Sequence, residues 1–189
     1  MSILTYIESK KYKAKKNSFE VISYARALAD QLSTDLVILC FNIKNVNELS
    51  NYGPDKILNI NNDELSQFNV QKYSEVISKA SSKLSISHIV IGGSTDCKYL
   101  APSLSVKTNS TYVSNVVSLP SSLTPFTLRR STFSNKAFSD VIIKNEKIII
   151  GICNNSFGLV EKKSSPEILN LEINISESTI NQESLELSS

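Results

Sequence analysis

The sequence has few of the residues that most often carry enzyme chemistry. Its 189 residues include one histidine, three cysteines, five glycines and no tryptophan. Histidine is the most common general base in enzymes, but the one here, His88, opens an apolar segment, where we favour a structural role. The sequence contains neither the G-x-S-x-G turn of serine hydrolases nor the H-E-x-x-H helix of zinc proteases. We therefore predict that this chain is not an enzyme and has no catalytic residue.

The cysteines argue against both a disulfide framework and a zinc site. Cys40, Cys97 and Cys153 are odd in number, lie far apart and form no C-x-x-C pair. Cys40 and Cys153 lie inside apolar runs, where a reduced thiol behaves as a small core residue. No leader pattern precedes the first apolar segment. These features predict no metal site and a reducing, cytoplasmic location.

Neither charge nor hydropathy indicates nucleic acid or a membrane. The formal net charge of +2 comes with scattered basic residues, and no apolar run reaches the roughly 18 residues that a membrane span needs. Only "KKYKAKK" (Lys10 to Lys16) concentrates positive charge. It fits either a solvated loop between a strand and a helix or a site for a polyanion, and we favour the loop. We predict no nucleic-acid partner and no membrane insertion.

Short β-rich runs alternate with helical patterns through the first part of the chain. This alternation is typical of βαβ units in a mostly parallel sheet. We expect Ser18 to cap the first helix. The sequence predicts an α/β fold with three layers, in which helices cover both faces of a twisted, mostly parallel sheet. The predicted strands are 2–8, 35–41, 56–60, 87–93 and 111–119, and the predicted helices are 18–32, 46–52, 70–84 and 94–107.

The pattern changes after residue 119. Three apolar runs, 126–133, 137–145 and 147–154, follow one another without a helix, and "KNEK" (Lys144 to Lys147) suits a hairpin turn. We therefore expect antiparallel strands at the C-terminal end of one domain, residues 1–160. Residues 161–189 are more polar and are predicted to form a linker, a possible strand at 168–173 and a disordered tail.

The segment "IVIGGSTDCKYLAP" (Ile89 to Pro102) comes close to a phosphate-binding loop. Gly92, Cys97, Lys98 and Tyr99 fall at the spacing of G-x-x-x-x-G-K-[ST]. Cys97 replaces the second glycine, however, and Tyr99 replaces the small hydroxyl that would hold magnesium. A loop that hydrolyses nucleoside triphosphates is therefore not expected.

A weaker ligand site stays open at the same turn. Open α/β sheets bind ligands at the carboxyl ends of their strands, and a helix N-terminus attracts anions. Gly92, Gly93, Ser94 and Thr95 would suit the phosphate of a nucleotide. The alternative, which we favour, is a tight strand-to-helix connection with a Ser/Thr cap.

Four segments of the sequence together carry a family resemblance. They are "YGPDKILNI" (52–60), "HIVIGGSTDCKYLAPSLS" (88–105), "TYVSNVV" (111–117) and "RSTFSNKAF" (130–138). In their order and approximate spacing these segments resemble the N-terminal domain of the electron-transfer flavoprotein alpha subunit. The resemblance extends over residues 3–158, and Cys97 and Ser134 stand where the family usually has glycine.

The resemblance implies a scaffold and docking domain in a heterodimer with the family's beta subunit. The whole complex would carry electrons through FAD from dehydrogenases, such as the acyl-CoA dehydrogenases of fatty acid beta-oxidation, to a quinone oxidoreductase and the quinone pool. FAD would belong to a C-terminal domain that this fragment lacks, so no cofactor is expected on this chain alone. The resemblance also implies a Rossmann-like fold of the adenine-nucleotide-hydrolase type. Lys98, Arg130 and Asn135 become interface candidates, with an ordinary surface role as the alternative.

Two other functions stay open. One is a free-standing nucleotide-binding module of the stress-protein type, which would use the turn from Gly92 to Thr95. The other is a small hydrolase or ligase of the adenine-nucleotide fold. The missing G-x-G-x-x-G after the first strand weakens the former, and the missing acid–base set weakens the latter.

Overall fold

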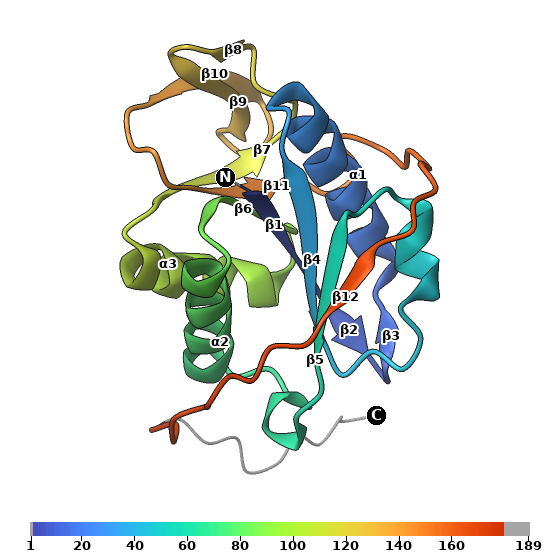
Figure 1. The fold of residues 1–189 in the computed structure, drawn as a ribbon. Helices are drawn as coiled ribbons and strands as arrows, with labels where there is room; N and C mark the ends of the chain where they lie inside the picture. Colours follow the sequence, from blue (N-terminus) through green and yellow to red (C-terminus); the bar gives the residue numbers. More distant parts are fainter. Residues whose placement is uncertain (1, 180–189) are drawn as a thin grey trace, which may run out of the picture.

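The protein folds around one ten-stranded sheet, seen in Figure 1 in the computed structural model, which describes residues 2–179. The strand order is β10-β9-β7-β11-β6-β1-β4-β5-β12, and β8 pairs with β9. The strands from β7 to β12 in this order are parallel, whereas β8, β9 and β10 are antiparallel. The bounds are β1 Ser2–Ile7, β4 Asp35–Phe41, β5 Lys56–Ile60, β6 Ile86–Ile91, β7 Thr111–Val116, β8 Ser122–Leu123, β9 Phe126–Thr132, β10 Ala137–Ile143, β11 Ile148–Ile152 and β12 Glu167–Leu169.

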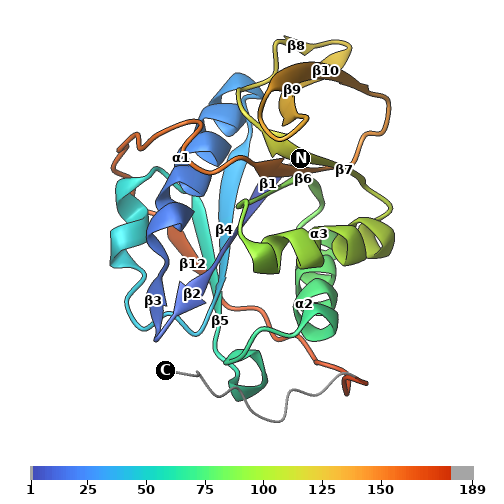
Figure 2. The ribbon, with the colours of Figure 1, turned by 180° about the vertical axis from the view of Figure 1, so that it is seen from behind.

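Helices cover both faces of this sheet. Helix α1 packs into one hydrophobic cluster, and α2 and α3 pack into a second cluster on the other face (Figure 2). The predicted three-layer, mostly parallel α/β fold is therefore confirmed. None of the helices described within residues 2–179 is long and apolar enough to cross a membrane. The helices are α1 Lys16–Gln31, α2 Val70–Lys83 and α3 Thr95–Thr108, with short 3-10 segments η1 Asn47–Asn51 and η2 Asp63–Leu65.

Strand β4 shows why the central strands read as continuous apolar runs. Leu36 and Ile38 belong to the cluster under α1, whereas Val37 and Leu39 belong to the cluster under α2 and α3. Side chains alternate between the faces of a strand, so both faces must be apolar when both are covered. Each such side chain contributes about 1.5–3 kcal/mol when it is buried.

Helix α1 begins earlier than the sequence indicates. Lys15 has an extended backbone and the helix starts at Lys16, so Ser18 lies within the first turn. The Ser18 hydroxyl donates a hydrogen bond to the Glu8 carbonyl, at 3.2 Å, instead of accepting one from the helix. The prediction that Ser18 caps α1 is wrong, because its hydroxyl bonds to the end of β1.

Strand β11 lies at the centre of the sheet. It runs parallel between β6 and β7, and all five of its residues are buried. The predicted hairpin at Lys144 to Lys147 is therefore wrong, and these residues connect β10 at the outer end of the sheet to the central β11. The run Ile148–Ile152 would expose one face at a sheet edge, and only a central position buries both faces. Of the three runs expected to be antiparallel, β9 and β10 are antiparallel, whereas the third, β11, is parallel to both neighbours. The short antiparallel strand β8 was not predicted.

The chain after β11, residues 153–179, forms a belt around the domain (Figure 1). Its first part lies against α1, where the rings of Phe157 and Tyr24 are 5.3 Å apart. Strand β12 then pairs with β5, so a strand is present at Glu167–Leu169, where 168–173 was predicted. Beyond it, Leu171, Ile173 and Ile175 pack against the cluster under α2.

The part of the belt after β12 also forms hydrogen bonds with α2. Lys79 donates to the Asn174 carbonyl at 2.7 Å, and Lys83 donates to the Glu172 carbonyl at 2.9 Å. These two bonds hold residues 172 and 174 of the belt against α2. Most of the predicted disordered tail lies outside the described residues.

Glu20 of α1 anchors the start of the belt. Its carboxylate accepts hydrogen bonds from the backbone N–H groups of Asn155, Phe157 and Gly158, at 2.9, 2.8 and 3.2 Å. Burial raises the pKa of Glu20, but these backbone donors outweigh burial and hold the pKa below its ordinary value. The carboxylate therefore stabilises the loop in its charged form.

We expect Glu20→Gln to lower the free energy of unfolding by about 1–3 kcal/mol at pH 7. The folded pKa lies below the unfolded one, so this stabilisation is present above the unfolded pKa and is lost as pH falls through the folded value. The difference between the two proteins should therefore shrink below about pH 4. Urea unfolding at several pH values measures it. Glu161→Gln, in an exposed part of the belt, serves as the control, and an equal loss in both variants would contradict the anchoring role.

Candidate functional site

The turn predicted as a weak phosphate site joins β6 to α3. Gly92, Gly93 and Ser94 connect the strand to the helix, which begins at Thr95. The Ser94 side chain accepts a hydrogen bond from the Cys97 backbone N–H at 3.1 Å and so caps the helix. The turn therefore has the geometry of a tight, capped strand-to-helix connection.

Packing accounts for the glycine pair in this turn. A Cβ atom at Gly93 would lie 2.7 Å from the Ile152 carbonyl oxygen and 3.1 Å from the Asn154 side-chain oxygen. A Cβ at Gly92 would lie 3.4 Å from Val21, at the margin of ordinary contact. Gly93 thus lets the carboxyl ends of β6 and β11 approach each other, and no bound phosphate is needed to explain it.

The protein places its own carboxylates at this edge. Glu8, at the end of β1, is 5% exposed and forms an ion pair with Lys15 at 2.7 Å. Lys15 also lies 3.6 Å from Asp96, in the first turn of α3. Asp96 complements the positive end of the helix dipole. A phosphate at the α3 N-terminus would face two carboxylates balanced by one lysine.

Ionisable groups around the Glu8 carboxylate are held in their ordinary protonation states. Burial, with Glu8 adding to it, raises the pKa of the Cys97 thiol to about 12. Burial likewise raises the pKa of Tyr6 well above its ordinary value. Burial lowers the pKa of Lys15, but its bond to Glu8 raises it more. At neutral pH the thiol and phenol stay protonated and the lysine stays charged, so these three groups offer neither a nucleophile nor a base.

Two hollows open at this edge of the sheet. One of about 300 Å³ is bordered by Tyr6, Glu8, Lys15, Tyr73 and Asp96, among others. The other, of about 490 Å³, lies where α1 begins and is lined by Lys16, Asn17, Glu20, Asn155, Gly158 and Leu159. Glu20 is already bonded to the belt. In each hollow, one carboxylate of the lining is therefore already bound within the protein: Glu8 by Lys15, and Glu20 by the belt.

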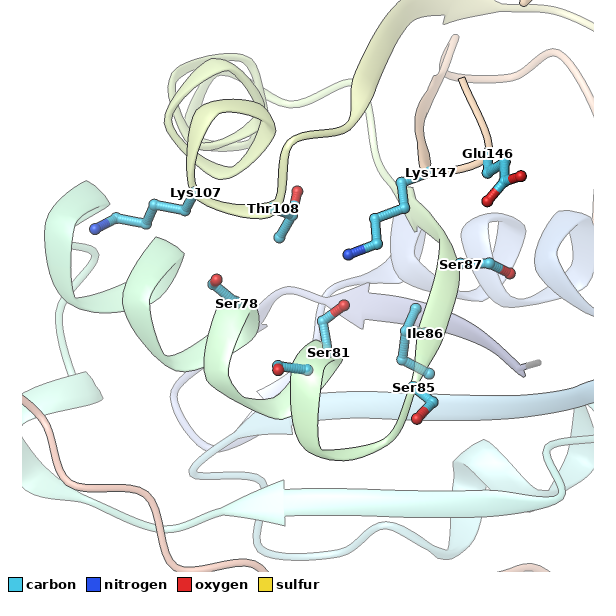
Figure 3. Close-up of a pocket in the computed structure, with 10 residues that line it drawn as sticks. Ser78, Ser81, Ser85, Ile86, Ser87, Lys107, Thr108, Glu146 and Lys147 are labelled. Atoms are coloured by element: carbon cyan, nitrogen blue, oxygen red, sulfur yellow. The ribbon is translucent and has the colours of Figure 1, made fainter. Parts of the chain in front are cut away.

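A further hollow of about 520 Å³ lies where α2 and α3 end (Figure 3). Serine hydroxyls line it, and Figure 3 shows the Lys147 side chain reaching over the last turns of α2 while Lys107 points away. Lysines near helix C-termini complement the negative ends of the dipoles. The hollow contains no histidine and no cysteine, and its ionisable lining residues are Lys107, Glu146 and Lys147.

Two further sequence predictions concern histidine and metal. His88 lies on β6, pairs with the Ser87 hydroxyl at 2.8 Å and packs its ring 5.3 Å from that of Phe126. Burial lowers the pKa of His88. Among residues 2–179, no three His, Cys, Asp or Glu side chains are grouped so that they could hold a metal ion. His88 therefore has the surroundings of a structural residue.

Two of the three interface candidates lie on the β9–β10 hairpin. Arg130, on β9, donates to the Ser114 hydroxyl at 2.8 Å, and its buried Nε has no hydrogen-bond partner within the described chain. Asn135, in the turn, accepts from the Ser131 hydroxyl at 2.7 Å. Lys98 is exposed on α3, and no hydrogen bond or ion pair joins it to Arg130 or Asn135 within residues 2–179. Lys98, Arg130 and Asn135 therefore do not form a single site in the structure.

The same hairpin exposes large apolar side chains. Phe133 is 79% exposed, Phe138 66% and Ile142 60%. Strand β10 ends the strand order of the sheet, so its outer edge has no strand beside it in the described chain. We call Phe133, Asn135, Phe138 and Ile142 the hairpin patch. Arg130 lies opposite Ser139 in the register, so its side chain is on the other face of the hairpin from Phe138 and Ile142. Exposed apolar groups around an unpaired sheet edge are typical of surfaces that meet another protein.

The hairpin turn also keeps an unusual backbone. Phe133, Ser134 and Asn135 all have positive φ, between 48° and 64°. Ser134, where the resembled family usually has glycine, thus adopts a conformation that favours glycine.

The sequence did not reveal Glu8 and Lys15, which form the ion pair at the carboxyl ends of the parallel strands. The available signal was an acidic residue at the end of a buried strand, next to a lysine-rich segment. A charge there needs a partner, because an unpaired buried charge is costly. Sequence alone did not identify Lys15 among the five lysines from Lys10 to Lys16.

Comparisons with known proteins agree with one another. The family model described as "Electron transfer flavoprotein domain" matches residues 3–175. The electron transfer flavoprotein subunit alpha of Bacillus subtilis (strain 168) is 24% identical over 149 residues, which cover 78% of this chain and 46% of that protein. The chain thus spans about half the length of the curated relative it matches.

If packing explains Gly93, then Gly93→Ala should destabilise the fold and Gly92→Ala should not. The added methyl of Gly93→Ala meets a backbone oxygen that cannot move freely, and overpacking of this kind costs about 1–3 kcal/mol. Gly92→Ala adds the same methyl one residue earlier and should cost less than about 1 kcal/mol. Urea unfolding of both variants measures this. Equal stability of the two variants would contradict the packing explanation.

Proposed function

The chain belongs to the electron transfer flavoprotein family, as an alpha-subunit N-terminal domain, and from that premise we propose that it serves as the scaffold and docking half of a heterodimer with a beta subunit. The hairpin patch is the observation that carries this proposal. It combines exposed aromatic and aliphatic side chains with an unpaired sheet edge. Aromatic side chains are enriched where protein interfaces derive their affinity.

We further propose that the chain has no catalytic residues of its own. The thiols of Cys40 and Cys97 are buried, and burial raises the pKa of each to about 12. In the whole protein, electrons would pass through FAD from dehydrogenases, such as acyl-CoA dehydrogenases, toward a quinone oxidoreductase and the quinone pool. The reducing cytoplasmic location expected from the cysteines belongs to this proposal as well.

The residues of this chain do not fit FAD. The α3 N-terminus, where a pyrophosphate would bind in a related fold, already has Asp96 in its first turn and lies next to the buried Glu8. Two carboxylates there, balanced by the single Lys15, oppose a doubly charged pyrophosphate. The same geometry argues against the alternative of a free-standing nucleotide-binding module. Flavin would therefore be held by parts of the whole protein other than these residues.

The docking proposal predicts loss of beta-subunit binding when the hairpin patch becomes polar. Phe138→Ser with Ile142→Ser should weaken association with the cognate beta subunit by at least about tenfold, because each side chain contributes about 1.5–3 kcal/mol when buried. Isothermal titration calorimetry of the 189-residue chain measures this. Both residues are exposed, so folding should be unaffected.

The matched control for this experiment is Val106→Ser with Leu159→Ser. These side chains are also exposed, at 83% and 63%, but lie outside the hairpin patch. The control pair should bind beta like the unchanged chain. Equal weakening by both pairs, or by neither, would contradict a docking role of the patch.

The poor fit to FAD predicts that this chain alone will not bind flavin tightly. A titration of the 189-residue chain with FAD, followed by flavin fluorescence, should show no stoichiometric quenching. Parallel titrations with AMP and ATP should also show no saturable binding. Tight stoichiometric FAD binding would contradict the proposal that the residues of this chain do not fit FAD. AMP or ATP binding without association with beta would favour the nucleotide-binding module instead.

A further inference from the structure

The lysine-rich segment after β1 folds as a small hairpin of its own. Strand β2 (Ser9–Lys10) pairs antiparallel with β3 (Lys13–Ala14). Lys11 and Tyr12 form the tip between them, both with positive φ, at 50° and 63°. We call Ser9 to Lys16 the lysine hairpin. In Figures 1 and 2 it stands clear of the main sheet, next to the start of α1.

Two features of this hairpin work against its own folding. Lys10 and Lys13 lie directly opposite each other in register, and like charges in such pairs are destabilising. The tip places Lys11 and Tyr12 in left-handed conformations, where Asn and Gly are the usual residues. Neither choice of residue is explained by stability. Residues that break local rules in this way are most often found at functional sites.

The positive charge of the hairpin is not neutralised by the protein. Lys10, Lys11, Lys13 and Lys16 are exposed, and within residues 2–179 none of them forms an ion pair. Lys15 differs, because it is half-buried and paired with Glu8 and Asp96. The turn predicted to be merely solvated therefore presents several free ammonium groups on one short hairpin.

Lys44 extends this cluster from the loop after β4. Its backbone N–H donates to the Tyr12 carbonyl at 3.1 Å, and its ammonium lies 4.6 Å from the centre of the Tyr12 ring. Tyr12 is itself 54% exposed. With Lys44, five lysines that form no ion pair within residues 2–179 lie on or beside the lysine hairpin, and Lys44 lies over the exposed Tyr12 ring.

We propose that the lysine hairpin is a docking element for an acidic surface on a partner protein. Lysine is a strongly hydrated point charge on a flexible stem, which suits attraction at a distance more than tight pairing. Charge complementarity of this kind raises association rates and gives contacts that weaken with salt. The surface is separate from the hairpin patch and does not rest on the flavoprotein function.

The residues favour a protein over a membrane or a nucleic acid. Tyr12 is the one exposed apolar residue of the hairpin, so there is no apolar face to enter a bilayer. The cluster contains no arginine to read base edges and a single aromatic ring on which a base could stack. An acidic protein surface needs neither feature.

The test uses fluorescein-labelled deca-glutamate as a probe of acidic protein surface. Fluorescence anisotropy with the unchanged chain should show binding at about 20 mM salt that weakens several-fold at about 150 mM. In amide NMR spectra the probe should shift residues 9–16 and 44 most. The triple variant K10Q/K11Q/K13Q should bind at least about tenfold more weakly.

The control is the triple variant K107Q/K136Q/K144Q, which removes the same net charge from exposed lysines outside the lysine hairpin. It should change binding less than about twofold. Equal weakening by both triple variants would overturn the proposal, because net charge alone would then explain binding. Absence of binding by the unchanged chain, or NMR shifts centred elsewhere, would also overturn it. So would tighter binding to phosphatidylserine vesicles or to a DNA duplex than to deca-glutamate.

A folding measurement separates a docking role from a structural one. Removing the facing lysines relieves like-charge repulsion, so the Tm of K10Q/K11Q/K13Q should equal or exceed that of the unchanged chain. A clear fall in Tm would show that the lysines hold the hairpin together and would overturn the docking role. If the chain does not bind the beta subunit but the deca-glutamate test succeeds, the lysine hairpin is a docking element for a partner other than the beta subunit.

Discussion

Burial of β11 on both faces of the sheet determines much of this structure. An apolar strand of five residues is fully buried only at the centre, so β11 lies between β6 and β7. This position brings its carboxyl end against the turn after β6, where Gly93 leaves room for the Ile152 carbonyl. It also brings the following loop to α1, where Glu20 bonds to three backbone N–H groups. The antiparallel strands β8, β9 and β10 are left at the outer end of the sheet.

The carboxyl edge of the sheet has places that attract anions, and the protein fills them with its own acids. Glu20 occupies the backbone N–H groups after β11, and Asp96 lies in the first turn of α3. Glu8 adds a third carboxylate beside them, held by Lys15. Backbone donors and helix dipoles are satisfied equally well by a side-chain carboxylate or by a phosphate. At this edge the backbone donors after β11 and the N-terminus of α3 are thus matched by carboxylates of the protein itself.

The two surfaces that remain open differ in physical character. The hairpin patch is apolar and lies on an unpaired sheet edge, and such surfaces gain affinity from the area removed from water. The lysine hairpin is charged and hydrated, so its attraction acts at longer range and falls with salt. The first kind suits a lasting subunit contact, and the second suits a brief encounter.

The sequence by itself determined the layers, because alternating strand and helix periods leave few ways to bury the apolar runs. The bounds of β4 and β5 and the start of α2 followed directly from those periods. Tertiary structure alone decided which strands are neighbours. The continuous apolar run 148–152 indicates a strand covered on both faces, but it does not say which strands lie beside it. In the same way, only folding brings the Lys15 ammonium to the Glu8 carboxylate and the Ser18 hydroxyl to the Glu8 carbonyl. Within residues 2–179 it leaves the other lysines of that segment without ion pairs. Contacts between distant residues depend on topology, and a single sequence records topology only through the burial that each strand requires.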